Sequence, residues 1–573
     1  MTSVHITIDD RELTAQAGQT ILEMAQEAGI DIPALCHHAS IEPIGACRMC
    51  MVEIGGQRAL QPACTFKVTE GAVVRTESEK VRAVRKFVLQ LLLSERNHFC
   101  MYCQTSGDCE LQNLAYRYGL DSWLYPRSYK PLPVDASRVY FVMDHNRCIL
   151  CRRCVRACSE LVGNHTLGLG QRGANTMVVA DLDVPFGESC CISCGTCLQV
   201  CPTGALMDRR SAYRGHEVDL DHTKSTCAFC SVGCGTDLVV RDNQLIRIDG
   251  DWDAAVGHGL LCVAGRFEPL FDTRKRIESP MVRHNGELAE TSWDEALAAA
   301  AAGIKSVDGS SVVGLASTRL TNETLRQFSQ VFRALGAGSV ATLTPVPDFV
   351  AEAEGSLAVL DEADLFLVVG EDLSVDHQVV GMAVKRGVRN RGAKLVLVGD
   401  GENGFSDLAD SQLATSEVDQ MLSAVRDAES PVVIYGSSAD GVLPQLRRAL
   451  ASSAQFVGLV PGTNARGALA AGLSGTFDSD GAKAAYILIA GDDVDDSVLG
   501  SLDDSAFVVA QASYAGPIVN RSDVVLPTTI WAEKSGTFTN TEGVTQECAA
   551  VLKAPEGVKS DQEILSALAE SLA

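Results

Sequence analysis

CILCRRCVRAC at residues 148–158 and CISCGTCLQVC at residues 191–201 are the two stretches that decide the fold of this 573-residue chain. Both have the spacing C-x2-C-x2-C-x3-C, so the second run repeats the first. Thiolates at this spacing wrap around a [4Fe–4S] cluster, and the last cysteine of each run ligates the other cluster of the pair. The sequence therefore predicts two [4Fe–4S] sites, one held by Cys148, Cys151, Cys154 and Cys201, the other by Cys191, Cys194, Cys197 and Cys158.

A second group of cysteines precedes the repeat, with the spacing C-x10-C-x2-C-x13-C. Residues 3–8 and 51–54 alternate like strands, and residues 21–28 read as a short amphipathic helix, which together form the pattern of a β-grasp ferredoxin. Four thiolates in that setting favour a [2Fe–2S] cluster, with a zinc site as the alternative. The predicted ligands are Cys36, Cys47, Cys50 and Cys64.

A third group, Cys100-x2-Cys103-x5-Cys109, supplies only three thiolates. A four-coordinate cluster needs one more ligand, and His98 is the nearest candidate. Isolated histidines are more often structural than metal-binding, so the spacing alone leaves this fourth ligand open. Residues 81–93, which precede the group, are apolar at helical spacing.

The last group is Cys227-x2-Cys230-x3-Cys234-x27-Cys262, which predicts a further [4Fe–4S] cluster, again with zinc as the alternative. Cys190 is left over beside the repeat, and we interpret Cys548 as a buried small residue. The expected cofactors are thus one [2Fe–2S] and four [4Fe–4S] clusters.

The cysteines are unevenly distributed along the chain. Twenty lie between Cys36 and Cys262, and only Cys548 follows them. Beyond residue 280 short Val/Ile/Leu runs alternate with helical segments, which predicts an α/β domain with buried parallel strands. These runs are 312–315, 365–369, 395–398, 432–435, 486–489 and 507–509. No GxGxxG or Walker A sequence accompanies them, so nucleotide binding has no direct support.

The net charge of −25 argues against nucleic acid as a partner. No cationic, apolar leader opens the sequence, and no apolar run is long enough to span a membrane. We therefore expect a cytoplasmic protein without a membrane span, in a compartment where clustered cysteines are metal ligands more often than disulfides.

These cysteine sets, in this order, resemble the large peripheral-arm iron–sulfur subunit (G type) of respiratory complex I. They equally resemble the iron–sulfur subunits of NAD-linked hydrogenases and the N-terminal part of NAD-dependent formate dehydrogenases. In complex I a histidine ligand precedes the third group as HxxxC, but here that place is Arg96. The HxC form at His98 is similar to the hydrogenase and formate dehydrogenase branch, and the resemblance implies that His98 is the fourth ligand.

The second half resembles the molybdopterin oxidoreductase domain. The matching stretches are CAFCSVGCG at 227–235, GHGLLCVAGRF at 257–267, STRLTNE at 317–323 and DVVLPTTIWAEKSGTFTNTEG at 523–543. Three departures favour a domain without an active site. No cysteine or selenocysteine follows Cys262 where those enzymes ligate molybdenum, near residues 343–347; Ala264 replaces their lysine; and the chain ends soon after Gly543.

The expected fold class is therefore multidomain α+β and α/β. The domains are a β-grasp [2Fe–2S] ferredoxin (1–80), a His/Cys3 cluster domain (81–135), a bacterial-type 2×[4Fe–4S] ferredoxin (136–215), a molybdopterin-oxidoreductase [4Fe–4S] domain (220–275) and a truncated molybdopterin-oxidoreductase-like α/β domain (276–573).

The resemblance implies an electron-transfer subunit of a multisubunit NAD(P)H-linked oxidoreductase, of the hydrogenase or formate dehydrogenase type, with no catalytic residues and no functional molybdopterin. Its partners would be a flavin- and NADH-binding subunit, a small [2Fe–2S] subunit and a further redox subunit such as a hydrogenase. Two alternatives stay open: the catalytic molybdenum or tungsten subunit of a formate dehydrogenase, and the complex I peripheral-arm subunit itself.

Overall fold

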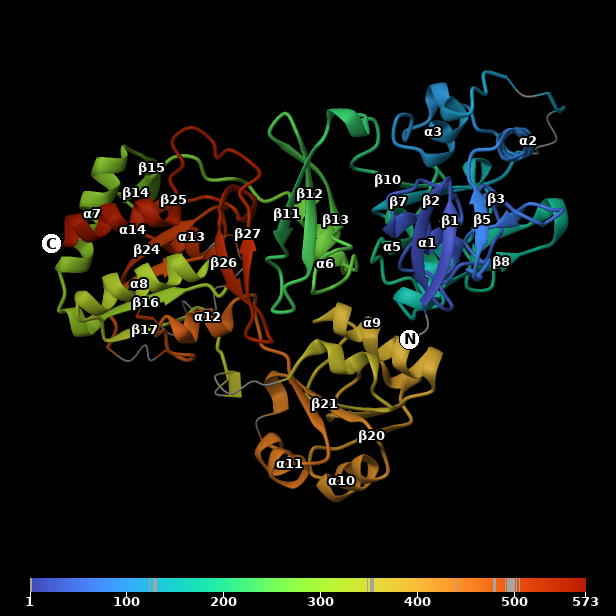
Figure 1. Cartoon of the computed structure of the whole chain (residues 1–573). Helices are drawn as coiled ribbons and strands as arrows, with labels where there is room; N and C mark the ends of the chain where they lie inside the picture. The colour runs from blue at the N-terminus through green and yellow to red at the C-terminus, as the bar shows by residue number, and fades with distance from the viewer. Residues whose placement is uncertain are drawn as a thin grey trace. The chain divides into compact units, whose positions relative to one another are not determined.

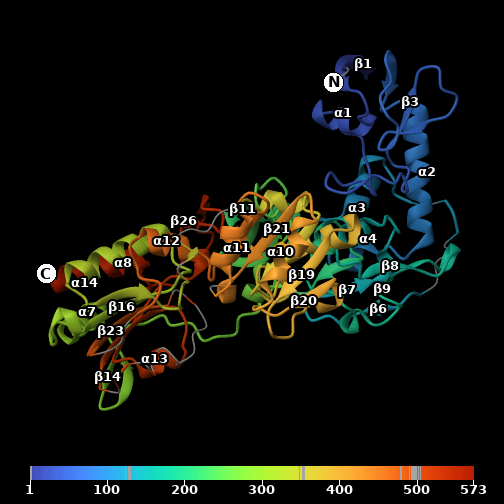
Figure 2. The ribbon, with the colours of Figure 1, turned by 90° about the horizontal axis from the view of Figure 1, so that it is seen from below.

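The structure is a computed structural model (Figures 1 and 2). It describes residues 3–122, 124–126, 131–347, 349–350, 355–439, 441–477, 481–489, 491, 500, 502–503 and 505–573. The chain divides into two units, Met1–Leu220 (unit 1) and Asp221–Ala573 (unit 2), and each is described by itself.

Unit 1 begins with a five-stranded sheet in the order β2-β1-β5-β3-β4. Its strands are β1 (Ser3–Ile8), β2 (Arg11–Gln16), β3 (Met51–Ile54), β4 (Gln61–Pro62) and β5 (Ala72–Arg75). β1 pairs in parallel with β5, and the other pairs are antiparallel. Helix α1 (Ile21–Glu27) begins at a capping box formed by Thr20 and Glu23, and its apolar face packs on the sheet. The β-grasp prediction matches this sheet.

Two helices and an irregular, cysteine-bearing segment follow. α2 (Glu79–Glu95) begins at the cap Ser78, and η1 (Cys100–Tyr102) and α3 (Glu110–Arg117) follow it. Leu89 and Leu93 of α2 share a small apolar core with Leu111 of α3. This core fixes the ends of the segment that carries His98, Cys100, Cys103 and Cys109.

The repeat lies between short strands. A three-stranded sheet has the order β10-β7-β6, and a hairpin pairs β8 with β9. The elements are β6 (Val134–Asp135), β7 (Phe141–Asp144), η2 (His145–Arg147), α4 (Arg153–Arg156), η3 (Ala157–Leu161), β8 (Leu167–Gly170), η4 (Gly173–Asn175), β9 (Met177–Ala180), η5 (Phe186–Glu188), α5 (Thr196–Gln199), β10 (Leu206–Asp208) and η6 (Glu217–Asp219). Each cysteine run ends in a short helix, α4 or α5.

Unit 2 starts with an antiparallel sheet of β11 (Asp221–Thr226), β12 (Gly235–Arg241) and β13 (Gln244–Gly250), followed by α6 (Val263–Arg266) and η7 (Glu268–Leu270). The remaining chain forms two lobes. The first contains the seven-stranded sheet β15-β14-β25-β24-β23-β16-β17, and the second, inserted between β17 and β23, contains the parallel sheet β20-β19-β18-β21-β22.

The first lobe consists of β14 (Met281–His284), β15 (Glu287–Glu290), α7 (Trp293–Lys305), η8 (Gly309–Ser311), β16 (Val312–Ala316), α8 (Asn322–Ala334), β17 (Ser339–Thr342), β23 (Ala484–Leu488), β24 (Phe507–Ala512), α13 (Pro517–Arg521), β25 (Val524–Pro527) and α14 (Asp561–Leu572). Helices α7, α8 and α14 cover one face of its sheet and α13 covers the other (Figure 2). Alternate residues of the buried strands face these two cores.

The second lobe consists of η10 (Leu357–Asp361), β18 (Leu365–Val369), α9 (Gln378–Arg386), η11 (Gly387–Arg391), β19 (Lys394–Val398), η12 (Ser406–Leu408), β20 (Ser411–Leu413), α10 (Val418–Arg426), β21 (Pro431–Tyr435), η13 (Ser437–Ala439), α11 (Leu443–Leu450) and β22 (Gln455–Gly458). α10 and α11 cover one face of its sheet, and α9 covers the other together with the cysteine loop of unit 2. Helix α12 (Ala465–Ala470), η15 (Trp531–Glu533) and the hairpin β26 (Gly536–Thr539) and β27 (Thr545–Cys548) complete the unit.

Candidate iron–sulfur cluster sites

The first cysteine set lies on loops around β3. Cys50 immediately precedes that strand, and its Sγ is 3.3 Å from Sγ of Cys64. The backbone N–H of Cys47 donates to Sγ of Cys36 at 3.4 Å. Hydrogen bonds from the Cys47 and Cys64 thiols lower the pKa of Cys36 to about 2, while the pKa values of Cys47 and Cys64 are raised. The opposite shifts arise because the thiols of this set lie within hydrogen-bond distance of one another, which is the closeness that a shared cluster needs.

Arg85 of α2 hydrogen-bonds the backbone of this loop. The sequence alone did not single out this residue. Its side chain is fully buried, and it donates from Nε to the Met49 carbonyl and from Nη2 to the Met51 carbonyl, both at 3.0 Å. These two carbonyls flank Cys50. Nη1 also donates to Glu77 at 2.7 Å and to the Tyr118 hydroxyl at 2.8 Å.

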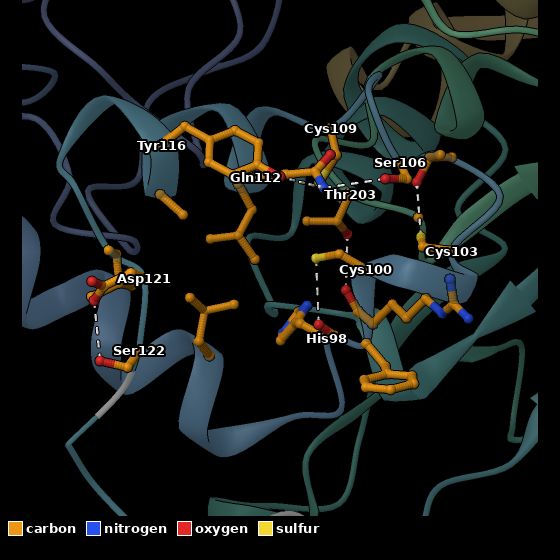
Figure 3. A pocket seen from close by; sticks show the side chains of 18 residues that line it. His98, Cys100, Cys103, Ser106, Cys109, Gln112, Tyr116, Asp121, Ser122 and Thr203 are labelled. Carbon is orange, nitrogen blue, oxygen red and sulfur yellow. Dashed lines mark hydrogen bonds between the residues drawn. The ribbon is translucent and has the colours of Figure 1, made fainter.

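The second set surrounds a cavity of about 140 Å³ that is lined by His98, Cys100, Cys103 and Cys109 (Figure 3). The Nε2 atom of His98 is buried and has no hydrogen-bond partner within the described residues. Burial, reinforced by the charges of Arg147 and Arg96, lowers the pKa of His98 to about 4. A neutral imidazole with a free nitrogen in a cavity with three thiols fits the fourth ligand of a [4Fe–4S] cluster.

Arg96, which takes the place of the complex I histidine, is buried and has a structural role. Its guanidinium donates to the carbonyl of His145 at 3.1 Å and to the carbonyl of Thr176 at 2.8 Å. Both acceptors are backbone groups of the ferredoxin region. The structure therefore gives Arg96 no part in the cavity wall, whereas His98 lies in it.

The two runs of the repeat are predicted to exchange their last cysteines. Burial raises the pKa of Cys151 to about 12, and the charges of the Cys201 and Cys148 thiolates add to this effect. Burial likewise raises the pKa of Cys191 to about 12, with contributions from Cys194 and Cys158. In both cases the thiol that contributes from the other run, Cys201 or Cys158, is the one that the crossed ligand prediction assigns to that group.

The fourth set lies in unit 2 between β11, β12 and α6. Burial raises the pKa of Cys227 to about 12, with Cys262 as the next contributor, and the pKa values of Cys230 and Cys234 lie well above the usual range for the same reasons. A Cβ added to Gly265 would lie 3.1 Å from Sγ of Cys227 and 3.8 Å from Sγ of Cys262. The backbone at Gly265 therefore lies close to these two sulfurs, and a larger residue would press on Sγ of Cys227.

Within the described residues, no group of three or more His, Cys, Asp and Glu side chains is arranged to hold a single metal ion. The grouped thiols and His98 are the observations that favour multi-iron clusters. Of the two remaining cysteines, Cys190 is exposed and its thiol donates to Oδ1 of Asp181 at 3.0 Å. Cys548 is buried against Ala228 and Phe538.

Residues 343–347 of unit 2, where a soft ligand for molybdenum would be needed, include no side chain of that kind. Leu343 and Val346, in the stretch where a soft ligand would be needed, are 1% and 2% exposed and belong to the apolar cores of the lobes. Ala264, in place of a lysine, lies in α6, two residues after Cys262. Hydrocarbon side chains offer the metal no donor atom.

Instead, the cysteine loop of unit 2 is fastened to the second lobe by a buried polar chain. Oγ of Ser231 lies 3.0 Å from Nε2 of His377, and Nδ1 of His377 lies 2.8 Å from Oε1 of Glu371 at the carboxyl end of β18. Behind the loop, the N–H of Thr541 donates to the Ser231 carbonyl at 2.7 Å. No spacing in the sequence indicates these contacts, because they join residues far apart in the chain.

Five family models match the chain. They are described as a 2Fe-2S iron-sulfur cluster binding domain (residues 1–79), the NADH-ubiquinone oxidoreductase-G iron-sulfur binding region (85–122), the ferredoxin-like domain of NADH-quinone oxidoreductase subunit 3 (140–207), the molybdopterin oxidoreductase Fe4S4 domain (220–269) and molybdopterin oxidoreductase (276–571). The predicted fold class and order of domains are confirmed.

Three curated relatives show what the chain is similar to. A G-type subunit of NADH-quinone oxidoreductase from Rhizobium meliloti is 34% identical over 69% of this chain and 48% of its own length. NADPH-Fe(3+) oxidoreductase subunit alpha of Geobacter sulfurreducens is 32% identical over 72% of this chain and 50% of its own length. The G-type subunit of NADH-quinone oxidoreductase from Streptomyces coelicolor is 28% identical over 99% of this chain and 79% of its own length. The chain spans about half the length of the first two. The predicted resemblance to G-type subunits is confirmed.

The helices that the structure describes include none long and apolar enough to cross a membrane.

Proposed function

The chain belongs to the molybdopterin oxidoreductase family, and from this premise we propose that it is an electron-transfer subunit of a multisubunit NAD(P)H-linked oxidoreductase. The observation that supports the proposal most strongly is the cavity lined by His98, Cys100, Cys103 and Cys109, together with the grouping of the other cysteines for which five ligand sets are predicted. When bound, iron–sulfur clusters supply one-electron transfer without bond breaking.

The side chains around the ligand sets bury, orient and connect them. Arg156 donates to the Cys36 carbonyl, and Arg153 donates to the Ala34 carbonyl at 2.9 Å and to Glu110. These two arginines lie in the first run of the repeat, so they tie it to the loop of the [2Fe–2S] set. Such fixed guanidinium contacts hold two neighbouring sites in one geometry. The basic stretch 147–156 in a chain of net charge −25 is the sequence signal for them.

In this proposal the lobes of unit 2 serve as a scaffold and do not hold a catalytically active molybdopterin. Buried Leu343 and Val346, and the loop fastened through Ser231 and His377, support that role. The expected partners are a flavin- and NADH-binding subunit, a small [2Fe–2S] subunit and a further redox subunit, of the hydrogenase or formate dehydrogenase type. A reducing compartment such as the cytoplasm keeps the thiols available.

The test is purification of the native complex, identification of its subunits and quantification of iron, molybdenum and tungsten. We expect about 18 iron atoms per chain from one binuclear and four cubane clusters, and cluster signals that NADH or NADPH bleaches. Half that iron would contradict the five ligand sets. Stoichiometric molybdenum or tungsten would instead favour a catalytic formate dehydrogenase subunit.

A second candidate function is the peripheral-arm subunit of complex I itself. The relative from Streptomyces coelicolor, a G-type subunit of NADH-quinone oxidoreductase, aligns with 99% of this chain and favours it. Copurifying membrane subunits and NADH-driven quinone reduction would identify this complex. Copurifying hydrogenase or formate dehydrogenase subunits would identify the first candidate.

A further inference from the structure

A groove of about 460 Å³ in unit 1 is lined by none of the predicted ligands. Its walls come from β6, β9 and the loop that ends at Phe186, and Met143 and Leu167 contribute to its apolar lining. Its volume is large enough for several side chains of another polypeptide. Nothing in the electron-transfer role of the ligand sets accounts for it.

Two strand edges border the groove. Within the described residues β6 pairs only with β7, and β9 pairs only with β8 apart from an isolated bridge between Ala180 and Val184. A strand edge presents unpaired N–H and C=O groups, to which an extended segment can add as a further strand. The groove is therefore shaped for extended backbone rather than for a helix.

The rim of the groove is apolar and exposed. Leu182 is 96% exposed, Val134 53% and Val184 39%. Val134 and Val184 line the groove, and Leu182 is next to the lining residue Asp183. Apolar side chains that gather around a groove on a soluble protein mark a surface that another protein covers.

Two carboxylates give the groove its charge. Asp135 and Asp183 line it, and neither forms an ion pair within the described residues. Asp135 accepts only neutral donors, the backbone N–H groups of Ser137 and Phe186 and the Ser137 hydroxyl. His145 also lines the groove, and its buried Nδ1 has no hydrogen-bond partner within the described residues. These groups favour a cationic side chain that can donate hydrogen bonds.

We propose that this groove docks an extended, apolar segment of a partner subunit that carries a lysine or arginine for Asp135 and Asp183. The inference rests on the proposed function in that it takes the chain to be part of a complex. A second copy of this chain fits less well, because each copy has a net charge of −25 and would bring like charge to the acidic groove.

The test compares hydrogen–deuterium exchange of the native complex with that of the isolated full chain. We expect the amides of β6 and β9 to exchange at least about tenfold more slowly in the complex. The variant Leu182→Ser/Asp183→Asn should abolish this protection. Asparagine is chosen because Asp183 has φ 73°, which asparagine tolerates. Val218→Ser/Asp219→Asn is the matched control, an exposed apolar–acidic pair of the same unit, and should keep the protection.

A benzoylphenylalanine placed at position 182 then identifies the occupant in the native complex. Cross-links to a partner segment with apolar residues and a lysine or arginine support the proposal. Cross-links to a second copy, or to residues 221–573 of the same chain, overturn it, as does equal exchange in the complex and the free chain. Iron content, measured on the same samples, tests the ligand sets of the proposed function separately, because the groove variant replaces none of their residues and should leave the iron content unchanged.

Discussion

Replacing Arg85 with methionine should loosen the [2Fe–2S] loop while leaving helix α2 in place. The fully buried guanidinium makes four hydrogen bonds, two of them to the Met49 and Met51 carbonyls. Methionine fills a similar volume but donates none, so both carbonyls lose a partner in an apolar setting. Each such loss costs about 1–3 kcal/mol.

The ion pair with Glu77 adds less, because the Glu77 side chain is 33% exposed and water can replace the guanidinium. The total loss in the free energy of unfolding is about 3–4 kcal/mol, within the range for removing one partner of a buried ion pair. For a unit of this size it corresponds to an apparent melting temperature lower by about 10 °C. Arg85→Lys should be intermediate, since an ammonium cannot span both carbonyls and the carboxylate.

The assay follows the visible absorption and circular dichroism of the [2Fe–2S] cluster during heating at a fixed rate. Arg82→Met is the matched control, because Arg82 lies on the same helix and binds the same Glu77 at 3.0 Å with a side chain that is 56% exposed. The Arg82→Met substitution should lower the free energy of unfolding by less than about 1 kcal/mol. Equal shifts for the two variants, or earlier loss of another cluster in Arg85→Met, would refute the reasoning.

Three further predictions concern the ligand sets and the core of unit 2. His98→Cys should shift the potential of one [4Fe–4S] cluster in a redox titration, and unchanged potentials of all clusters would remove His98 from the ligands. Cys201→Ser should lower iron by about four atoms per chain in elemental analysis, whereas Cys190→Ser should not change it. Burial raises the pKa of Tyr486 well above its usual value. Its contribution to stability is therefore complete below about pH 10 and is lost as the pH rises further, by about 1.4 kcal/mol per pH unit. Denaturant unfolding of Tyr486→Phe should lack this slope.

Much of the fold follows from local sequence patterns. Alternation predicts the strands at 3–8 and 51–54, which the structure has as Ser3–Ile8 and Met51–Ile54. The helix predicted at 81–93 extends to Glu79–Glu95, by two residues at each end, and at the N-terminus the cap Ser78 accounts for the added pair. Buried runs such as 365–369 are strands because continuous apolar sequence suits a sheet covered on both faces.

Other parts could not be predicted, and the reason is physical. The strand order of the first lobe, where β23 to β25 return beside β16 after the second lobe, depends on long-range packing that no local period encodes. Arg85 lies in a helix whose other arginine, Arg82, faces solvent, so its burial has no sequence signal. The same holds for His377, whose partners Ser231 and Glu371 come from separate parts of the chain.

The predicted exchange of Cys201 and Cys158 between the two runs has a consequence for how the ferredoxin region can change over evolutionary time. In the predicted arrangement each run contributes a thiol to the other run's cluster. A deletion or recombination that replaced one run alone would spoil both groups at once. The two halves can therefore be inherited only as a pair, and a substitution tolerated in one run is judged by its effect on the other.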